Sequence, residues 1–504
     1  MESMSYASIN TQALNGVTAL PVSVEVHISS GLPALSIVGL PEAAVRESKD
    51  RVRAAIINSG FDFPMQRITI NLAPADLPKD GGRYDLPIAI GILAASKQVP
   101  DELLQQFEFH GELALSGELR PVSGSLPVAI GANRLKHTLI MPVSSAVLAA
   151  LIKETDIFQA SHLLEICQYL HQQKDLSRPQ ITTPKFTRHS LDINDVKGQH
   201  RAKRALEIAA AGRHNMLMVG PPGTGKTMLA SRLCGLLPPL TEQQSIDSAA
   251  ICSISHHGFD INEWGQRPFR SPHHTASGVA LVGGGSNPKP GEISLSHNGV
   301  LFLDELTEFD RHTLDVLREP LETGMITISR AARQAEFPAN FQLIAAMNPC
   351  PQGYNCDGKS LCQCTPEQQL KHRSRISAPL LDRIDIHIEV PTVDRKTLLN
   401  DSEKSESSAT IKQRVELAFN KQLSRCGKTN AELNSRETEE QCKLKSAEIK
   451  LLEQAMEKLK LSARAYHRIL RMSRTIADLD DSKDIESKHL SEAISYRSLD
   501  RFLT

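Results

Sequence analysis

The stretch NMLMVGPPGTGKTMLASRL, from Asn215 to Leu233, decides how this sequence folds. It opens with the apolar run Met216 to Val219, which is typical of a buried parallel strand. A glycine-rich turn follows, and a helical pattern then places Leu229, Leu233 and Leu236 on one face. The order of strand, glycine-rich loop and helix predicts a loop that holds phosphate groups, because the amides at the start of such a helix point at them.

The loop matches the pattern G-x-x-x-x-G-K-[ST] in the context that this pattern requires. Its glycines let the backbone wrap the phosphates of ATP, and we expect Lys226 to reach the β and γ phosphates. The hydroxyl of Thr227 is a suitable oxygen ligand for Mg²⁺. The residues expected to hold the nucleotide are Gly220, Pro221, Pro222, Gly223, Thr224, Gly225, Lys226, Thr227 and Met228.

Two further apolar runs end in polar residues. GVLFLDEL, from Gly299 to Leu306, has the pattern of a buried parallel strand that ends in two acids, although alone it would better fit a surface strand end with two solvated acids. Beside a phosphate loop, we expect Asp304 to hold Mg²⁺ through water and Glu305 to act as general base. FQLIAAMNP ends a third strand with Asn348, which either orients the attacking water or forms a turn.

The bulk composition restricts the class of protein. At 504 residues the chain exceeds what one core supports, so we expect about three domains. The formal net charge of −1 leaves only local basic clusters for contacts with nucleic acid. No apolar run approaches the roughly 18–20 residues of a membrane span, and the first residues lack a signal-peptide pattern. The nine cysteines are therefore expected to be thiols or metal ligands in a cytoplasmic protein with no membrane partner.

In their order and spacing, the three motifs resemble those of AAA+ ATPases. The stretch RPFRSPHHTASGVALVGGGSNPKPGEISLSHNG, Arg267 to Gly299, is similar to the insert of the magnesium-chelatase and MCM-helicase branch. With the N-terminal region described below, the whole chain resembles the YifB/ComM family, which are bacterial magnesium-chelatase-like proteins with a Lon-like N-terminal domain.

The resemblance implies three domains. Residues 1–172 are expected to form an α+β domain of the Lon protease-like (ribosomal S5 domain 2-like) fold, and a polar linker would follow over 173–190. Residues 191–392 would form the AAA+ α/β core, a parallel sheet with helices on both faces, with a Cys-rich loop at 350–364. Residues 393–504 are helical in pattern and would form a C-terminal lid of the magnesium-chelatase type.

The resemblance also assigns two arginines. LLDRIDI, Leu380 to Ile386, is similar to the branch's arginine-finger motif, so Arg383 would complete the site of a neighbouring subunit. Without the family, pairing of this arginine with an adjacent aspartate would be the simpler interpretation. LSARAYHRIL resembles the second sensor helix and puts Arg464 near the nucleotide. Sites completed by a neighbour require a ring, and the family implies a homo-hexamer.

A predicted β-hairpin is the candidate DNA contact. GMITISRAARQAEFPANFQLI, Gly324 to Ile344, carries Arg330 and Arg333 at its tip. In the helicase branch the matching hairpin lines the pore, so these side chains are expected to bind the DNA backbone without reading its sequence. A solvated hairpin with ordinary arginines is the alternative.

Four cysteines cluster in NPCPQGYNCDGKSLCQC, and they are Cys350, Cys356, Cys362 and Cys364. Thiolates in a short turn-rich loop suit tetrahedral Zn²⁺, although the spacing is not a common zinc pattern. The neighbouring pair His273–His274 has no adjacent carboxylate or cysteine in sequence that would make a metal site, and its role is not assigned.

The N-terminal region is similar to Lon proteases at two places. VSVEVHI and ITINLAP alternate as half-buried strands do, and Glu42 to Ser59 has a helical pattern. PKDGGRYD, Pro78 to Asp85, resembles the nucleophile loop but has Arg83 in place of serine, and Leu126 falls where the catalytic lysine is expected. Proteolysis by a Ser/Lys dyad should therefore be absent. Arg83 and Lys79 either place positive charge at this position or are ordinary loop charges.

The functional hypothesis is a hexameric ATP-dependent motor that moves along single-stranded and branched DNA. The family resemblance implies branch migration during integration of single-stranded DNA in natural transformation and homologous recombination, with recombination proteins as possible partners. Two alternatives stay open: a motor that drives metal insertion into a tetrapyrrole, as chelatases do, and an AAA+ chaperone or scaffold that acts on a protein partner.

Overall fold

The computed structural model describes residues 5–180, 191–285, 287–330, 333–353, 362–394, 397, 406–459, 461–497 and 499. The chain forms two compact units, and each draws on two separate stretches of sequence. The first contains Met1–Phe186 and Ser245–Trp264, and the second contains Thr187–Gln244 and Gly265–Thr504. Among the described residues, no helix has both the length and the apolar character to cross a membrane.

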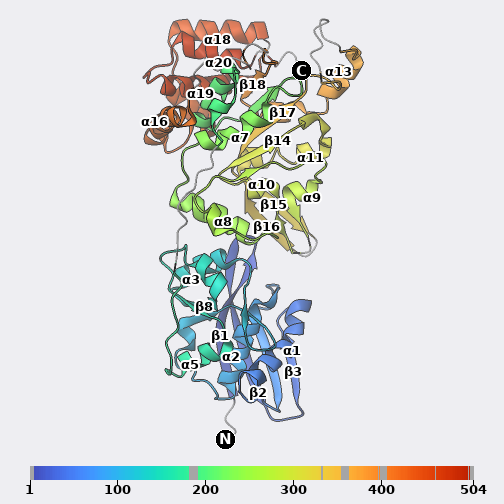
Figure 1. Ribbon diagram of the computed structural model, residues 1–504, viewed down its shortest axis with the longest axis vertical. Coiled ribbons are helices and arrows are strands. Elements are labelled where there is room, and N and C mark those ends of the chain that lie inside the picture. The colour runs from blue at the N-terminus through green and yellow to red at the C-terminus, as the bar shows by residue number, and fades with distance from the viewer. Residues whose placement is uncertain are drawn as a thin grey trace. The chain divides into compact units, whose positions relative to one another are not determined.

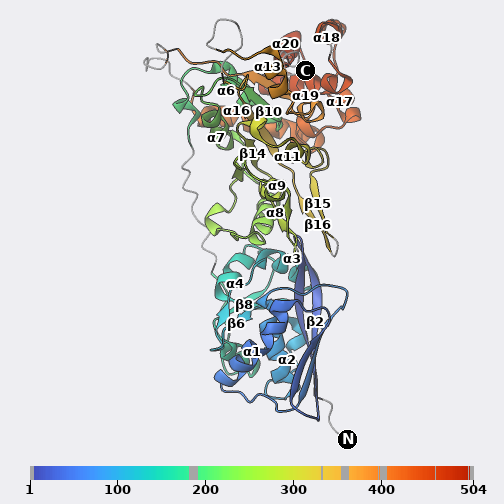
Figure 2. The same ribbon diagram turned by 90° about the vertical axis from the view of Figure 1, so that its right-hand side faces the viewer.

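The first unit is built on a mixed seven-stranded sheet in the order β3-β4-β2-β1-β5-β8-β9. Strands β1 and β2 form a long antiparallel hairpin (Figure 2), and β5, β8 and β9 continue the sheet in parallel. The expected strands and helix of this region are present as β2, β4 and α1. The strands are β1 Ser5–Asn15, β2 Thr18–Ser29, β3 Ala34–Val38, β4 Arg67–Ala73, β5 Phe107–Phe109, β8 Thr138–Pro142 and β9 Ile157–Ala160, with a small hairpin of β6 Glu112–Leu113 and β7 Leu119–Arg120.

Helices of the first unit pack on this sheet, and one of them comes from far along the chain. Every residue of α2 is buried, which explains its continuous apolar sequence. Helix α8 follows the phosphate-loop helix in sequence, yet its Ala249 and Ala250 belong to the hydrophobic core of α3, β8 and α4. The helices are α1 Ala43–Asn58, α2 Asp85–Ala95, α3 Ser125–Leu135, α4 Val143–Ala149, α5 Leu163–Leu170 and α8 Glu242–Ser253.

The Lon-like loop lies inside the first unit. The Arg83 guanidinium is buried and its Nη2 donates to the carbonyl of Ser123 at 3.0 Å, so the loop meets the segment that leads into Leu126. Lys79 is also buried, and its ammonium donates to the carbonyl of Pro74. Both cations are buried, so neither is an ordinary solvated loop charge.

The second unit contains a five-stranded sheet in the order β11-β14-β17-β10-β18, and all neighbouring strands are parallel. Figure 1 shows β14, β17 and β18 with helices around them. The strands are β10 Met216–Val219, β11 Phe269–Arg270, β14 Val300–Leu303, β17 Gln342–Met347 and β18 Ile386–Glu389. Strand β10 has the predicted bounds, because Asn215 and Gly220 end its apolar run on both sides.

Both faces of this sheet are covered. Alternate residues such as Met216, Met218 and Phe302 face a core shared with α6, α7, α16 and α19, and the residues between them are also buried. Leu229, Leu233 and Leu236 of α7 belong to the same core, as predicted, and each such side chain contributes about 1.5–3 kcal/mol when fully buried. Burial on both faces is what a parallel sheet requires.

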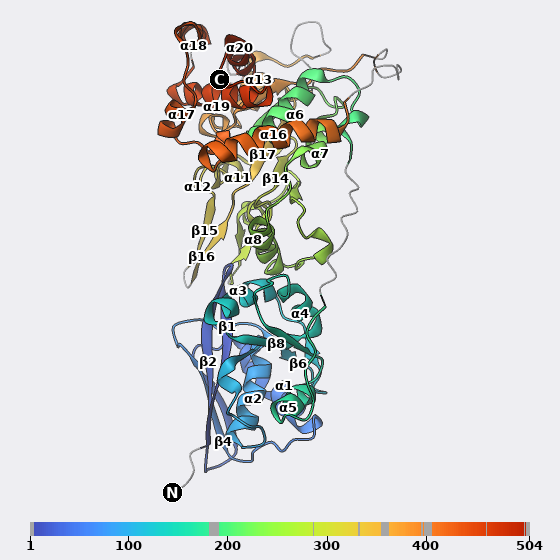
Figure 3. The same cartoon turned by 90° about the vertical axis from the view of Figure 1, so that its left-hand side faces the viewer.

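The remaining elements of the second unit surround this sheet, and Figure 3 shows α16 beside α6 and α7. The insert after β11 and the hairpin after α12 are separate small elements. They are α6 His200–Gly212, α7 Lys226–Leu236, α9 Gly278–Val282, β12 Gly283–Gly284, β13 Lys289–Pro290, α10 Glu292–Leu295, α11 Arg311–Asp315, α12 Pro320–Thr323, β15 Met325–Arg330, β16 Arg333–Pro338, α13 Pro366–Arg373 and α14 Ala378–Leu381. The C-terminal helices are α16 Ser408–Cys426, α17 Ser435–Gln441, α18 Ser446–Leu459, α19 Ala463–Leu479 and α20 Ser487–Ser495.

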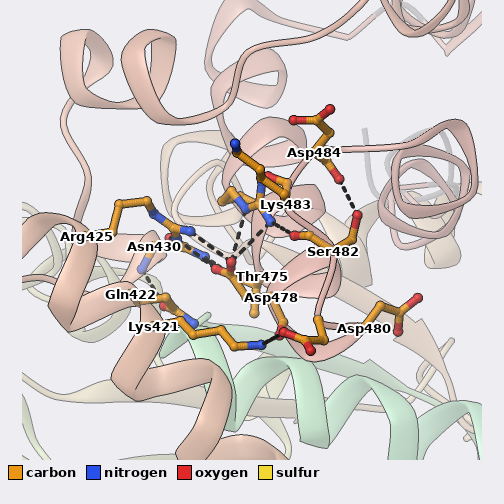
Figure 4. A network of polar contacts seen from close by, with 12 residues as sticks. Lys421, Gln422, Arg425, Asn430, Thr475, Asp478, Asp480, Ser482, Lys483 and Asp484 are labelled. Carbon is orange, nitrogen blue, oxygen red and sulfur yellow. Dashed lines mark hydrogen bonds and ion pairs between the residues drawn. The ribbon is translucent and has the colours of Figure 1, made fainter.

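A buried carboxylate holds the C-terminal helices together (Figure 4). Asp478 on α19 is 3% exposed and accepts hydrogen bonds from Arg425 of α16 at 2.7 and 2.8 Å. Asn430 and Arg474 donate to the same carboxylate at 2.9 and 3.2 Å. The bond to Asp478 raises the pKa of Arg425. Because both carboxylate oxygens are paired, the charge is tolerated in the interior and fixes α16 against α19.

Candidate nucleotide-binding site

The phosphate loop connects β10 to α7 through two backbone conformations that favour glycine. Gly223 has φ 78° and Gly225 has φ 88°, both in the left-handed region. Gly225 is the N-cap of α7, so the first amides of that helix are left without partners inside the helix. The loop therefore presents backbone donors and the positive end of a helix dipole to one point.

Lys226 is buried at the base of this loop. Its Nζ donates to the carbonyls of Gly220 at 2.7 Å and Pro221 at 2.9 Å, and to Oδ1 of Asn348 at 3.2 Å. Burial lowers the pKa of Lys226, and the negative charges of Asp304 and Glu305 oppose this effect. Phosphate oxygens are stronger acceptors than carbonyls, so a nucleotide would compete for this ammonium and release Asn348.

Thr227 and Asp304 lie together at the same edge of the sheet. The Thr227 hydroxyl donates to Oδ2 of Asp304 at 2.6 Å, and the amide of Glu305 donates to Oδ1 at 2.9 Å. Parallel pairing of β14 with β17 and of β17 with β10 brings these strand ends side by side. A hydroxyl and a carboxylate at this separation fit Mg²⁺, which takes oxygen ligands and would neutralise phosphate charge when bound.

Asn348 is held by a residue that sequence reasoning did not find. Nε2 of the buried His372 lies 3.2 Å from the Asn348 carbonyl and 3.3 Å from the Thr307 hydroxyl. Burial lowers the pKa of His372, which favours the neutral imidazole. Nothing in the local pattern of His372 marks this contact, because the partners are far apart in sequence.

Glu305 has a partner on the insert. Its side chain is 50% exposed, and its Oε2 lies 3.1 Å from Nδ1 of His274. The backbone of Glu305 is left-handed with φ 51°, which is uncommon for a residue with a side chain. The structure thus brings together Lys226, Thr227, Asp304 and Asn348, and it pairs Glu305 with one histidine of the unassigned pair.

Arg383 and Arg464 line a different cavity. This cavity has a volume of about 510 Å³, and none of residues 220–228 lines it. Five arginines and three acids line the cavity, so positive charge is in excess. The acids are Glu322, Asp385 and Glu432, and the arginines are Arg213, Arg383, Arg464, Arg468 and Arg471. A cavity with such an excess of guanidinium groups suits a polyanion such as a phosphate chain.

Asn215 and Asp385 fix the position of the segment that carries Arg383. Asn215 donates from Nδ2 to the Arg383 carbonyl at 3.0 Å, and the amide of Asn215 donates to Asp385 at 3.2 Å. Burial disfavours the ionised Asp385, but the His214 imidazole, whose Nδ1 lies 3.4 Å from Oδ2, and the charge of Arg468 outweigh it and hold the pKa of that carboxyl below its ordinary range. The Arg383 guanidinium contacts Glu322, and its Nε has no hydrogen-bond partner among the described residues.

Two predicted sites lie partly outside the described residues. The hairpin of β15 and β16 is present, with Arg330 opposite Arg333 in the register, but the side chains of both arginines are outside the described set. Cys356 is also outside it. The thiols of Cys350, Cys362 and Cys364 lie within 4.8 Å of one another, so the three described members of the cluster can share one metal ion.

Two arginines of the insert, Arg267 and Arg270, make contacts within the protein. Arg267 donates to the carbonyls of Pro238 and Asn298, both at 2.6 Å, and burial lowers its pKa to about 10. Arg270 makes a bidentate contact with Glu292 at 2.7 Å through both nitrogens. These arginines therefore pin the insert to the sheet.

Comparison with known protein families agrees with this geometry. Residues 192–398 match the family described as magnesium chelatase, subunit ChlI, and residues 405–497 match its C-terminal domain. Residues 24–145 match the family described as subunit ChlI of Mg-chelatase. The fold, the polar site at the edge of the sheet and the three family matches together define an AAA+ ATPase of the magnesium-chelatase type.

Relatives that align over their full length identify the family within the magnesium-chelatase type. The chain is 51% identical over 500 residues to the uncharacterized protein YifB of Salmonella typhimurium, covering 99% of this chain and 98% of YifB. It is 50% identical over 505 residues to the competence protein ComM of Haemophilus influenzae, covering 99% of both. The magnesium-chelatase subunit ChlI of Cyanophora paradoxa is 24% identical over 233 residues, which cover 40% of this chain and 59% of that subunit. The chain belongs to the YifB/ComM family.

Replacement of the expected general base tests the site directly. We expect Glu305→Gln to retain ATP binding and to lose roughly 10²–10⁴-fold in turnover, because the amide cannot accept the proton of the attacking water. Nucleotide affinity and steady-state phosphate release measure the two effects. Glu308→Gln is the matched control, since Glu308 is a neighbouring acid whose side chain contacts Arg375 at 3.3 Å. Undiminished hydrolysis by Glu305→Gln would exclude Glu305 as the base.

Proposed function

We propose that this protein is a hexameric, ATP-driven DNA motor that promotes branch migration when single-stranded DNA is integrated into a duplex. It would act in the cytoplasm on single-stranded and branched DNA during natural transformation and homologous recombination. The observation that carries the proposal is the separation of two half-sites, a complete phosphate loop at the sheet edge and an arginine cavity elsewhere on the same unit.

The half-site at the sheet edge supports ATP hydrolysis. Lys226 and the loop amides bind phosphates, and Thr227 with Asp304 would hold Mg²⁺. Glu305 would take the proton of the attacking water, and Asn348 would orient that water. These groups converge because β10, β14 and β17 run parallel and end at one edge.

The arginine cavity supports a ring. Arg383 is 9% exposed in its side chain, and it lines a cavity with Arg464 that has no phosphate-loop residue in its wall. Because no residue of its own phosphate loop borders this cavity, the guanidinium would stabilise the transferred phosphate on a neighbouring subunit. Identical subunits that each donate an arginine to the next make a head-to-tail contact, and such contacts form a ring when the rotation between neighbours closes.

The relatives support a motor that acts on DNA over a motor that inserts a metal ion into a tetrapyrrole. The Haemophilus relative is named competence protein ComM, and its alignment covers 99% of both chains, whereas the alignment with the chelatase subunit covers 40% of this chain. The hairpin of β15 and β16 carries Arg330 and Arg333 on adjacent strands, where their charges would meet a phosphate backbone. A chaperone acting on a protein partner would need neither arginine.

Zinc would brace the loop after Asn348. The Sγ atoms of Cys350 and Cys362 lie 3.4 Å apart. Two thiolates on one tetrahedral Zn²⁺ lie about 3.8 Å apart, given Zn–S bonds of about 2.3 Å. Burial, followed by the neighbouring thiols, raises the pKa of Cys364 to about 11, and a bound cation reverses this preference because it binds the thiolate. Cys356 would supply the fourth ligand.

Strand displacement tests the motor. ATP should drive wild-type protein to separate a forked duplex, and Glu305→Gln should abolish this. Arg330→Ala should keep most of the ATPase activity, displace strands more slowly and reduce the salt slope of DNA binding by roughly one for each subunit that contacts the DNA, because each of them loses one phosphate contact. Gln334→Ala, an exposed neutral position on β16, is the matched control. Unchanged displacement by Arg330→Ala would contradict the DNA contact.

Subunit mixing tests the ring. Arg383→Ala alone should lose roughly 10³–10⁵-fold in turnover, and Lys226→Ala should be inactive because it cannot hold the phosphates. An equal mixture of the two should recover about a quarter of the wild-type rate, since one interface in four joins an intact loop to an intact finger. A mixture no more active than its components would place the finger in its own chain's site.

Metal analysis tests the cysteine cluster. Protein purified without chelator should contain about one zinc per chain, and Cys364→Ser should lose most of it, because tetrahedral sites bind weakly with a thiolate removed. Elemental mass spectrometry measures the content. Cys442→Ser removes a buried thiol outside the cluster and should keep the metal. Equal zinc in both variants would mean that the metal binds elsewhere.

A further inference from the structure

Strand β3 forms one edge of the seven-stranded sheet, and this edge lacks the features that ordinarily keep sheet edges apart. Among the described residues, β3 pairs with β4 on one side and with no strand on the other (Figure 1). Proteins usually protect such an edge with charged side chains, prolines or bulges. The segment from Ile28 to Pro41, ISSGLPALSIVGLP, has no charged residue, and β3 itself has no proline. An edge without this protection is suited to pairing with a further strand.

Apolar side chains are exposed along this edge. Leu32 is 88% exposed, Leu40 is 58% exposed and Val38 is 47% exposed. Leu35 and Ile37 point to the opposite face of the strand, where they pack against the core of the first unit. Exposed apolar residues that lie together, rather than singly, mark a contact with another protein. We call residues 32–40 the β3 edge.

The backbone of β3 presents hydrogen-bonding groups to the unpaired side. The amide of Ala34 donates to the carbonyl of Gln66 at 3.4 Å, so the backbone groups of Ala34 face β4. The direction of the backbone groups alternates along a strand, so those of Leu35 and Ile37 point away from β4. These two residues are therefore the ones that can bond to a further strand.

The sequence of β3 is self-complementary about Ser36. When two copies of β3 pair antiparallel with the two Ser36 residues opposite each other, Ala34 lies opposite Val38 of the second copy. Leu35 then lies opposite Ile37, and these are the residues whose backbone groups point outward. Residues opposite each other in a hydrogen-bonded pair exchange both of their N–H···O bonds. One register thus satisfies the backbone groups and places apolar side chains against apolar side chains.

This two-fold pairing brings no like charges together. Arg67 is the one charged residue in the sequences of β3 and β4, and it lies beside Ala34. Because Ala34 of each copy is opposite Val38 of the other, the two Arg67 side chains fall at opposite ends of the joined sheet. Leu32 of each copy meets the Leu40 end of its partner, so exposed leucines cover each other. A second copy of this chain is therefore the partner that fits the β3 edge.

A single contact of this kind is small. Gly39 and Leu40 have φ values of 95° and 54°, so the regular strand ends at Val38. Its five residues are fewer than the roughly 20–30 residues on each side of a stable interface. Two isolated chains should therefore associate weakly, and the contact becomes strong where several copies of it act together.

We propose that the β3 edge is a two-fold interface between two copies of this protein, formed by antiparallel pairing of β3 about Ser36. The pairing of two chains is independent of the proposed function. Its consequence for assembly rests on the proposed function, because a two-fold contact added to a head-to-tail ring joins two rings face to face. Each subunit of one ring then contacts one subunit of the other, and the weak contacts add up.

Cysteine crosslinking of the full-length protein tests the register. Opposite residues of a non-hydrogen-bonded antiparallel pair have Cα atoms about 4.5 Å apart, which is within the range of about 4.4–6.8 Å for a disulfide. Ser36→Cys should therefore form a disulfide-linked dimer under mild oxidation, in excess over the background from the nine cysteines of wild type. Val38→Cys is the matched control and should stay at the background, because Val38 lies opposite Ala34. No excess in Ser36→Cys, or an equal excess in both variants, would overturn the proposal.

Sedimentation equilibrium at micromolar concentrations tests the association without a crosslink. Lysine on a sheet edge opposes pairing, so Val38→Lys should halve the mass of the largest species, both for protein alone and with an ATP analogue and a forked oligonucleotide. Tyr6→Lys is the matched control and should keep the wild-type mass. Tyr6 is 54% exposed on β1, which β4 and β2 separate from β3. An unchanged mass in Val38→Lys would contradict the interface, and melting temperatures of all variants confirm folding.

The masses separate this interface from the proposed function. Paired chains without rings would contradict the proposed hexamer and support the interface. Single rings in wild type, together with no excess crosslink in Ser36→Cys, would overturn the interface and leave the proposed hexamer standing.

Discussion

A parallel strand buried on both faces can offer polar groups only at its ends, and the second unit is organised by this constraint. Its five strands run in one direction, so every strand delivers its last residues to the same edge. Thr227, Asp304 and Asn348 meet there although they come from separate parts of the chain. The same rule brings the residues after β11 to Glu305. The direction of the strands therefore sets the place where the polar side chains meet and where the chemistry of the site can occur.

The second organising feature is the division of charge within the unit. The loop edge gathers acids with one lysine, whereas the other cavity gathers five arginines around three acids. Asn215 connects the two, because it precedes β10 and holds the Arg383 carbonyl, and its Oδ1 accepts from the amide of Leu343 on β17. Asn215 therefore couples the position of β10 to that of the segment that carries Arg383.

The local sequence pattern was sufficient to predict the strands and the residues of the phosphate loop. Met216 to Val219 is bounded by residues that end an apolar run, and Asp304 follows the next such run, so both positions could be predicted. Contacts between residues that are far apart in the sequence could not be predicted. His372 reaches Asn348, and His274 reaches Glu305, through tertiary packing that leaves no periodic signal. Burial of Lys79 was missed for the same reason, since a lysine in a loop is ordinarily solvated.

Helix α8 has a consequence for how this protein can be divided. The segment Ser245–Trp264 is encoded inside the ATPase sequence but completes the core of the first unit, where Ala249 and Ala250 are buried. A truncation that starts at residue 191 would expose the buried face of this helix, and a fragment ending at residue 180 would have an open core. Neither half is a module that recombination could transplant by a single cut.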